Sequence, residues 1–396
     1  MVPLRNNDMK IELADNNEDV YANFLDYMKS PETQRMYIRN LRIFLNLIPN
    51  KIFEDYLKEK PRSREIEDLA TAFANLAKKD INITKQIIKS YIKETKKEVE
   101  AGKISPNTVK NRVKPIKALL SANEIDISWS MINKMFPREI RSDDRAYTKE
   151  EIQEMLEHCT DIIDKLIILM FSSSGFRLEA WDYFCWKDVI FFPVEDNNFK
   201  GAALRVYRGD PEEYWTFITP ETCKILQLYK KEWKSRFLND PNPDDPLIAS
   251  TKFDFPHRLR QKGVRARVDK IVTKIGLRDR HKKGQRRFEV KLDHGFRKYF
   301  NTMMRRAKVN YLDKEDMMGH KVGLEKNYER YQEDDFERFP EYQKAIPFLT
   351  ISKEEILKAE NDALRDKNSE LDFIHKEALV SLSDRVIDLE KRLAEK

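Results

Sequence analysis

Two residues that could bind a phosphate, His294 and Arg297, stand three positions apart, close to one helical turn, so both can leave the same helix face. Leu292, Phe296 and Phe300 recur at intervals of four and supply an apolar face that a fold can bury. A basic pair on a helix with a buried back can hold a phosphate. A solvated helix that simply carries two cations shows the same pattern, so the remaining residues must decide.

Other residues of this kind follow one another along the chain. Arg177 comes directly after a Ser/Gly turn at residues 172–175, at the expected start of a helix. The helix dipole disfavours a cation there, and an anion nearby would explain it. Further on, Gly319-His320 precedes two tyrosines, Tyr328 and Tyr331. Each feature alone is compatible with a structural role, but their grouping in one stretch of chain favours a common site.

The composition excludes several classes of protein. The chain has 396 residues, of which 40% are hydrophobic and 36% charged, with only 10 glycines and a net charge of +6. These values favour two largely helical domains and a polyanionic partner, or long solvated helices. No apolar run could span a membrane and no signal core is present, so we expect an intracellular protein. The three cysteines are far apart in the sequence and form no C-x-x-C motif, so we expect reduced thiols without a metal site or disulfide. They are Cys159, Cys185 and Cys223.

The first half of the chain predicts a flexible tail at residues 1–16 and an all-helical domain at residues 17–136. Ser30-Pro31 and Ser105-Pro106 each place a capping serine before a proline, which is a helix start. Pro115 should kink or split the second of these helices. Both helices carry basic residues opposite an apolar stripe, as an ordinary charged bundle also does. The candidate phosphate contacts are Arg35, Arg39, Arg42, Lys110, Arg112 and Lys114.

A polar stretch at residues 137–147 is predicted to link this domain to a second one at residues 148–350. Thr148 and Glu151 have the spacing of a capping box, and an almost wholly apolar helix at residues 161–173 should be buried. Three short stretches predict a small antiparallel sheet: residues 186–192, 203–207 and 214–218. The predicted fold class is mainly α with a small antiparallel β-sheet.

Residues 257–291 form a strongly basic segment, with fourteen lysines or arginines and only three acidic residues. Such a density of like charge repels itself unless phosphates neutralise it, although a solvated basic face is the alternative. The candidate phosphate contacts are Arg258, Arg260, Arg265, Arg286 and Arg287.

The last segment, residues 351–396, has a different pattern. Leu357, Leu364, Leu371 and Ala378 are spaced by seven, and the repeat continues in a new phase from Leu382. This spacing predicts one long C-terminal helix that could form a coiled coil, or that could fold back on the second domain.

The ordered set resembles the tyrosine recombinases of the phage-integrase family. The family pattern is an early arginine, a His-x-x-Arg box, a Gly-His box and a tyrosine soon after. Here Arg177, His294 to Arg297, Gly319-His320 and Tyr328 match it. The resemblance covers about residues 148–335 and extends to the helical domain before them. The residues around the boxes look most similar to those of archaeal integrases. It implies a helical core-binding domain followed by a mixed α+β catalytic domain.

The resemblance also implies a mechanism. The tyrosine hydroxyl attacks the scissile phosphate and leaves a 3′-phosphotyrosine, which a second DNA end reverses without ATP, metal or any other cofactor. Arg177 and Arg297 would clamp the non-bridging oxygens, because arginine offers paired donors and lysine does not. His294 and His320 would donate hydrogen bonds to the phosphate or move the proton of the nucleophile.

The chain departs from the family pattern at the residue that protonates the leaving group. It also offers two tyrosines as the nucleophile. The family usually protonates the leaving 5′ oxygen with a lysine on a β-hairpin, whereas the matching residue here is Arg208. Arginine stays protonated and is a poor acid, so Lys200 on the preceding turn is the alternative. The usual spacing from the Gly-His box favours Tyr328 over Tyr331 as the nucleophile.

The function implied is that of a site-specific DNA recombinase, an integrase of a mobile element. It would bind double-stranded DNA as a homotetramer, and it would lie in the cytoplasm on the nucleoid. A type IB topoisomerase-like enzyme that nicks and closes strands shares the same residues and is one alternative. A DNA-binding protein of the same fold that has lost catalysis is the other, and Arg208 in the lysine position points that way.

Overall fold

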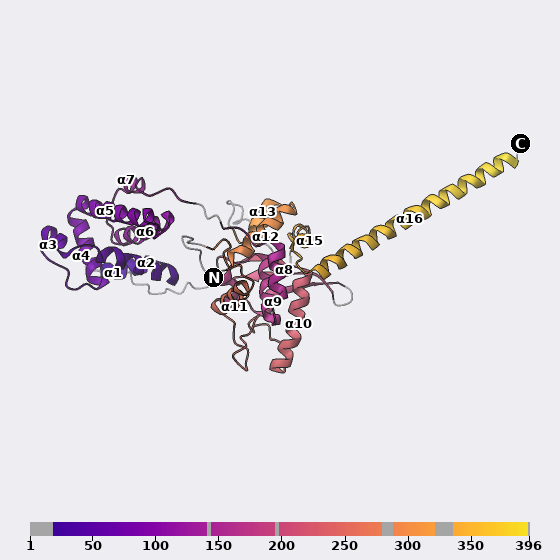
Figure 1. Cartoon of the computed structure of the whole chain (residues 1–396), viewed down its shortest axis with the longest axis horizontal. Coiled ribbons are helices and arrows are strands. Elements are labelled where there is room, and N and C mark those ends of the chain that lie inside the picture. The colour runs from indigo at the N-terminus through magenta and orange to yellow at the C-terminus, as the bar shows by residue number, and fades with distance from the viewer. Residues whose placement is uncertain (1–18, 141–143, 195–197, 279–287, 321–335, 395–396) are drawn as a thin grey trace, which may run out of the picture. The chain divides into compact units, whose positions relative to one another are not determined.

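The computed structural model describes residues 19–140, 144–194, 198–278, 288–320 and 336–394. Clustering of the backbone divides the chain into two compact units, Met1–Ser142 and Asp143–Lys396, which are described separately. The predicted fold class is confirmed, because the described residues form mainly helices and one three-stranded antiparallel sheet (Figure 1). None of the described helices is both long enough and apolar enough to cross a membrane.

The described part of the first unit consists of helices around one apolar core. Phe44 of the second helix packs edge-on against Phe73 of the fourth, and both are buried. The Ser30 side chain accepts the backbone N–H of Thr33, which is the predicted helix start. The helices are α1 (Val20–Asp26), α2 (Pro31–Asn46), α3 (Asn50–Leu57), α4 (Ile66–Lys79), α5 (Ile81–Glu100), α6 (Pro106–Ala122) and α7 (Ser130–Asn133).

Pro115 was predicted to kink or split its helix, and the split is excluded, whereas the kink stays a prediction. α6 runs unbroken from Pro106 to Ala122 with Pro115 inside it. Proline removes one backbone hydrogen bond from a helix, but the ring of Pro115 is buried beside Val113 and Ile116. Burial of this apolar face stabilises the helix through the position where its hydrogen bonding is interrupted.

The predicted linker at residues 137–147 is attached at both of its ends. The Asn107 side chain exchanges two hydrogen bonds of 2.9 Å with the backbone of Ile140, within the first unit. Arg145 forms ion pairs of 2.6 Å with Glu151 and with Glu289, within the second unit. Both ends of the predicted linker are therefore held by contacts within their own units, and residues 141–143 lie outside the described residues.

The second unit begins at the predicted capping box, in which Thr148 and Glu151 bond each other's backbone N–H groups. Its antiparallel sheet has the strand order β1-β2-β3, with Val206 paired to Tyr214 at one end. Its strands are β1 (Val189–Pro193), β2 (Phe199–Val206) and β3 (Tyr214–Ile218). The first strand starts later than predicted, because Trp186–Asp188 form a short 3₁₀ turn, η2.

The helices of the second unit surround this sheet. They are α8 (Lys149–Glu157), α9 (Ile162–Ser174), η1 (Leu178–Asp182, a 3₁₀ helix), α10 (Pro220–Phe237), α11 (Gln261–Lys274), α12 (His294–Arg306), α13 (Tyr311–Met317), α14 (Phe339–Gln343), α15 (Ile346–Leu349) and α16 (Lys353–Ala394). The predicted long C-terminal helix is therefore present as α16 (Figure 1).

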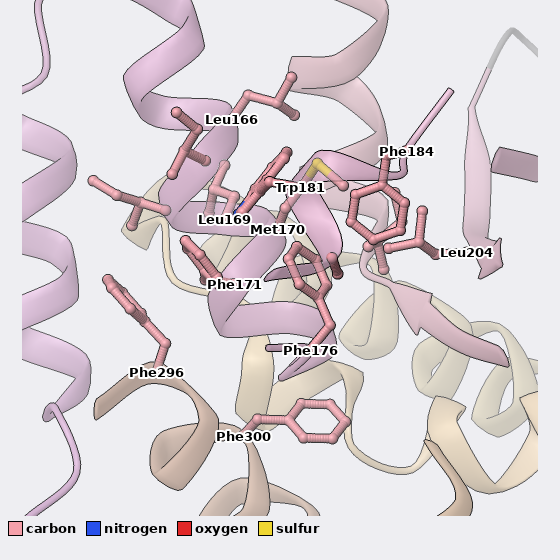
Figure 2. Close-up of a cluster of buried hydrophobic side chains, with 14 of the residues drawn as sticks. Leu166, Leu169, Met170, Phe171, Phe176, Trp181, Phe184, Leu204, Phe296 and Phe300 are labelled. Atoms are coloured by element: carbon pink, nitrogen blue, oxygen red, sulfur yellow. The ribbon is translucent and has the colours of Figure 1, made fainter. Parts of the chain in front are cut away.

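The core of the second unit is built around α9, as its apolar sequence predicted. Phe171 of α9 stacks on Phe296 of α12, with ring centroids 5.6 Å apart (Figure 2). Leu292, Phe296 and Phe300 are all buried, so the apolar face predicted for this helix is confirmed. This packing fixes α12 beside the turn at the end of α9, and that turn precedes Arg177.

The turn itself depends on Gly175, which ends α9 with a φ of +62°. A Cβ at this position would lie 2.4 Å from Cδ1 of Phe300.

Gly209 has a similar φ of +79° but open space around it. We expect Gly209→Ala to cost about 1 kcal/mol from backbone strain alone. Gly175→Ala should cost about 1–3 kcal/mol more, because it also overpacks the core. Urea unfolding of both variants tests this, and equal losses would contradict it.

Candidate active site

Arg297 joins three parts of the sequence that are far apart in the chain. Its guanidinium is buried, with only 7% of the residue exposed. Nη1 donates a hydrogen bond of 2.7 Å to the carbonyl of Gly175, in the turn before Arg177. Nη2 donates one of 2.6 Å to the carbonyl of Met318, next to the Gly-His box. Arg297 therefore holds the early-arginine turn and the Gly-His box against α12.

Arg177 lies close enough to Arg297 for the two charges to interact. Burial lowers the pKa of Arg297, and the nearby charge of Arg177 lowers it as well. Arg177 is half-buried, and it forms no hydrogen bond or ion pair with any residue that the structure describes. Two neighbouring guanidinium groups repel each other in a partly buried site, so an anion bound between them would be stabilised.

His320 continues the hydrogen-bonded chain that starts at Arg297. Its Nε2 lies 2.7 Å from Nη2 of Arg297, and its Nδ1 lies 2.5 Å from Oε2 of Glu315. A guanidinium can only donate, so Nε2 accepts and the ring proton sits on Nδ1, where it is donated to Glu315. His320 thus presents a neutral ring with a fixed tautomer, and the Glu315 carboxylate orients it.

Sequence reasoning missed Glu315, because an acidic residue on a charged helix carries no pattern of its own. The pKa of the Glu315 carboxyl is lowered: hydrogen bonds from Lys314 and His320 outweigh the burial that opposes them. Its position on α13, four residues before the Gly319-His320 pair that follows this helix, was the available signal. Glu315 is therefore favoured as the carboxylate, which accepts the hydrogen bond from Nδ1 of His320.

Tyr214, at the start of β3, is a second residue of the site that sequence reasoning did not assign. Gly319 has a φ of +67°, and a Cβ there would lie 2.5 Å from Cε1 of Tyr214. The Tyr214 hydroxyl is buried without a well-formed hydrogen bond to a described residue. Burial raises its pKa, although the charges of Arg297 and Arg177 act in the opposite direction. The ring of Tyr214 therefore forms a wall of the site, and only glycine fits against it.

Other predicted catalytic residues are His294 and the two tyrosines. His294 is the first residue of α12, one turn from Arg297, and is exposed. Tyr328 and Tyr331 lie outside the described residues. The structure therefore brings Arg177, Arg297 and His320 together, and leaves His294 at the edge of this group.

One known protein that resembles this chain in sequence is a tyrosine recombinase. No family model matches the chain. Tyrosine recombinase XerA of Saccharolobus solfataricus is 22% identical over 320 residues, which is 79% of this chain and 89% of that protein. The match is longer than either unit, and the boxes of the family stand in order around one buried arginine. The chain therefore resembles the tyrosine recombinase family.

Solved structures of the family also resemble the chain. A crystal structure of XerA recombinase is 17% identical, covers 83% of this chain and 97% of that chain, and has a TM-score of 0.35. A lambda integrase(75-356) dimer bound to a COC′ core site is 12% identical, covers 80% and 95%, and has a TM-score of 0.46. These scores are below 0.5, so the family assignment does not rest on them.

Arg208 was predicted to match the position at which this family usually has a lysine. Its guanidinium is held by an ion pair and a hydrogen bond. Its Nε lies 2.5 Å from Oδ1 of Asp188, a buried carboxylate, and its Nη2 donates a hydrogen bond of 2.9 Å to the carbonyl of Lys187. The preceding residue, Tyr207, lies within range of the Arg177 charge. Lys200 sits at the other end of β2, about 20 Å along the strand, which weighs against it.

A modified substrate can test whether Arg208 assists the leaving group. We expect Arg208→Ala to slow cleavage of ordinary DNA about 100-fold. A substrate with sulfur in place of the bridging 5′ oxygen needs no proton on the leaving group, so its cleavage should be restored. Arg205→Ala removes another hairpin arginine, which is paired to Glu213 at 2.8 Å, and should show no such rescue. Equal slowing of both substrates by Arg208→Ala would assign Arg208 a structural role.

The predicted phosphate contacts of the first unit differ in how free they are. Arg39, Arg42 and Lys114 are exposed and form no ion pair with a described residue. Arg35 pairs with Glu32 at the surface. Lys110 pairs with Glu139 at 3.0 Å, and Arg112 is half-buried against Glu98 at 2.8 Å. α2 therefore presents the freer basic face of the two helices.

The basic segment of the second unit is divided in the same way. Arg260 and Arg265 are exposed at the beginning of α11. Arg258 instead donates hydrogen bonds to the carbonyl of Phe184 and to Sγ of Cys185, so it serves the fold. Arg286 and Arg287 lie outside the described residues.

Proposed function

We propose that the protein is a site-specific DNA recombinase, an integrase that cleaves and rejoins DNA strands through a covalent 3′-phosphotyrosine. The observation that carries this proposal is the pairing of buried Arg297 with Arg177, which has no partner among the described residues. Three of the five N–H donors of Arg297 are engaged with Gly175, Met318 and His320, which leaves two for the Tyr214 hydroxyl or a ligand. A phosphodiester of DNA matches this set of donors.

In the proposed reaction, the non-bridging oxygens of the scissile phosphate accept hydrogen bonds from Arg177 and from the free donors of Arg297. The hydroxyl of Tyr328 attacks phosphorus, its proton passes to a basic group such as His294, and the bond to the 5′ oxygen breaks. The leaving oxygen takes up one proton and becomes a 5′ hydroxyl. Attack by the 5′ hydroxyl of a second strand reverses these steps, so the bond energy is conserved.

The proposed partner is double-stranded DNA, bound by exposed basic residues of both units. Exchange between two duplexes breaks four strands, which requires four active sites, and we propose a homotetramer on DNA. Among the similar structures is a lambda integrase tetramer bound to a Holliday junction. The charge on α2 and at the start of α11 supports contacts with the phosphate backbone.

The proposal is tested by incubating the protein with circular DNA from its own source that carries two copies of a candidate site. We expect products with exchanged ends, together with protein covalently joined to a 3′ phosphate. Relaxed circles without any exchanged ends would instead indicate a nicking and closing enzyme. Binding without an adduct would indicate a DNA-binding protein that has lost catalysis.

The basic face of α2 makes a separate prediction about salt dependence. Because a protein cation that contacts a phosphate releases a counterion, Arg39→Ala should lower the slope of log affinity against log salt by about 1. Arg62→Ala removes an exposed arginine outside α2 and should leave the slope unchanged. Fluorescence anisotropy with labelled duplex at several salt concentrations measures both slopes. Unchanged slopes for Arg39→Ala would remove α2 from the DNA interface.

A further inference from the structure

One side of α16 carries a row of exposed leucines and asparagines. Leu357, Leu364 and Leu371 are spaced by seven and are 59%, 59% and 44% exposed. Asn361 and Asn368, each four residues after a leucine, are exposed and lie on the same side of the helix. The row, which we name the α16 seam, continues through His375, Ala378 and Leu382.

The alternation of leucine and asparagine indicates what covers the seam. In a heptad repeat these leucines take the d positions and the asparagines the a positions. Asparagine at an a position fixes register and oligomeric state at some cost in stability. Its amide is satisfied by the same asparagine of a parallel partner in register, whereas an unrelated apolar helix would leave Asn361 and Asn368 buried without partners.

Two of the residue pairs that flank the seam are complementary in the same arrangement, whereas Lys353 would face the partner's Lys358. In a parallel pair, the residue before an a position faces the partner's residue five places further along. Lys367 would face the partner's Asp372, and Ile374 would face the partner's Leu379. Opposite charges and apolar side chains at these positions both favour self-pairing. Val380 lies outside the seam and stays exposed in this arrangement.

We propose that α16 pairs with α16 of a second copy of this chain, as a parallel two-stranded coiled coil in register along the seam. The protein is then a dimer before it meets DNA, and two protomers reach a DNA site together. This association does not depend on the recombinase reaction, so it can be tested without DNA.

Sedimentation of the full chain in the absence of DNA measures the association directly. We expect twice the mass of one chain at micromolar concentration. Leu364→Lys combined with Leu371→Lys should give monomers without unfolding the protein, because both side chains are exposed. Val380→Lys changes an exposed apolar residue outside the seam and should remain dimeric. A monomeric parent chain, a trimer, or a dimer that survives the double substitution overturns the proposal.

Cysteine crosslinking tests the parallel register. Under mild oxidation we expect Asn368→Cys to form a disulfide-linked dimer, because equivalent a positions face each other. Glu377→Cys, on the outer side of the pair, should not crosslink. The parent chain should not crosslink either, because Cys159 and Cys223 are buried and Sγ of the partly buried Cys185 is bonded by Arg258. A dimer in which Asn368→Cys does not crosslink overturns the parallel, in-register arrangement.

Discussion

Replacing Tyr328 by phenylalanine should abolish formation of the covalent protein–DNA adduct. Phenylalanine lacks the hydroxyl that attacks phosphorus in the proposed reaction, so no phosphotyrosine can form at this position. A nicked substrate, from which the cleaved fragment diffuses away, traps the adduct of the parent chain for detection on a denaturing gel. DNA binding without cleavage should be unchanged, because the change removes a single oxygen atom.

Tyr331→Phe is the matched control for this experiment. It removes a hydroxyl three residues further along the same segment, and the adduct should still form. If Tyr331→Phe abolishes the adduct and Tyr328→Phe does not, Tyr331 is the nucleophile. Adducts of normal yield with both variants would contradict a tyrosine from this segment.

Replacing Arg297 by lysine should lower the rate of strand cleavage by about 100- to 1000-fold or more, the usual loss for one preorganised donor. An ammonium group cannot span the carbonyls of Gly175 and Met318 and still reach a phosphate, because it lacks the planar fork of a guanidinium. The change therefore removes a phosphate donor and loosens the turn before Arg177. Single-turnover cleavage at saturating protein isolates this effect from DNA affinity.

Arg305→Lys provides the control, since Arg305 lies on the same helix and is exposed. It should cleave at nearly the parental rate. Arg297→Lys should also unfold at lower urea concentration, because two buried carbonyls lose a donor. Cleavage within a few-fold of the parental rate for Arg297→Lys would contradict the role of Arg297 as a phosphate clamp.

Local patterns in the sequence predicted the parts of the site that depend on local packing. The spacing of Leu292, Phe296 and Phe300 predicted which face of α12 is buried, because apolar residues four apart share a helix face. The capping box at Thr148 predicted the start of α8. This pattern is also local, because its hydrogen bonds span only three residues. The order of arginine and histidine boxes predicted the site through resemblance to a family.

The contacts that assemble the site could not be predicted from local patterns. Arg297 bonds the carbonyl of Gly175, which lies 122 residues earlier in the chain, and this pairing depends on how α9 and α12 pack. Charge density also failed to separate free from tethered cations. Arg260 and Arg258 stand two residues apart, yet the first is exposed and the second bonds the backbone of Phe184. Only the fold determines which of them can reach DNA.

The structure of the parent chain trapped on a nicked substrate would test the central claim most directly. We predict a phosphorus atom bonded to Oη of Tyr328, with its non-bridging oxygens within hydrogen-bond distance of both Arg177 and Arg297. His320 should remain bonded to Glu315 through Nδ1. A phosphate that is joined to another residue, or that lies beyond the reach of both arginines, would contradict the account.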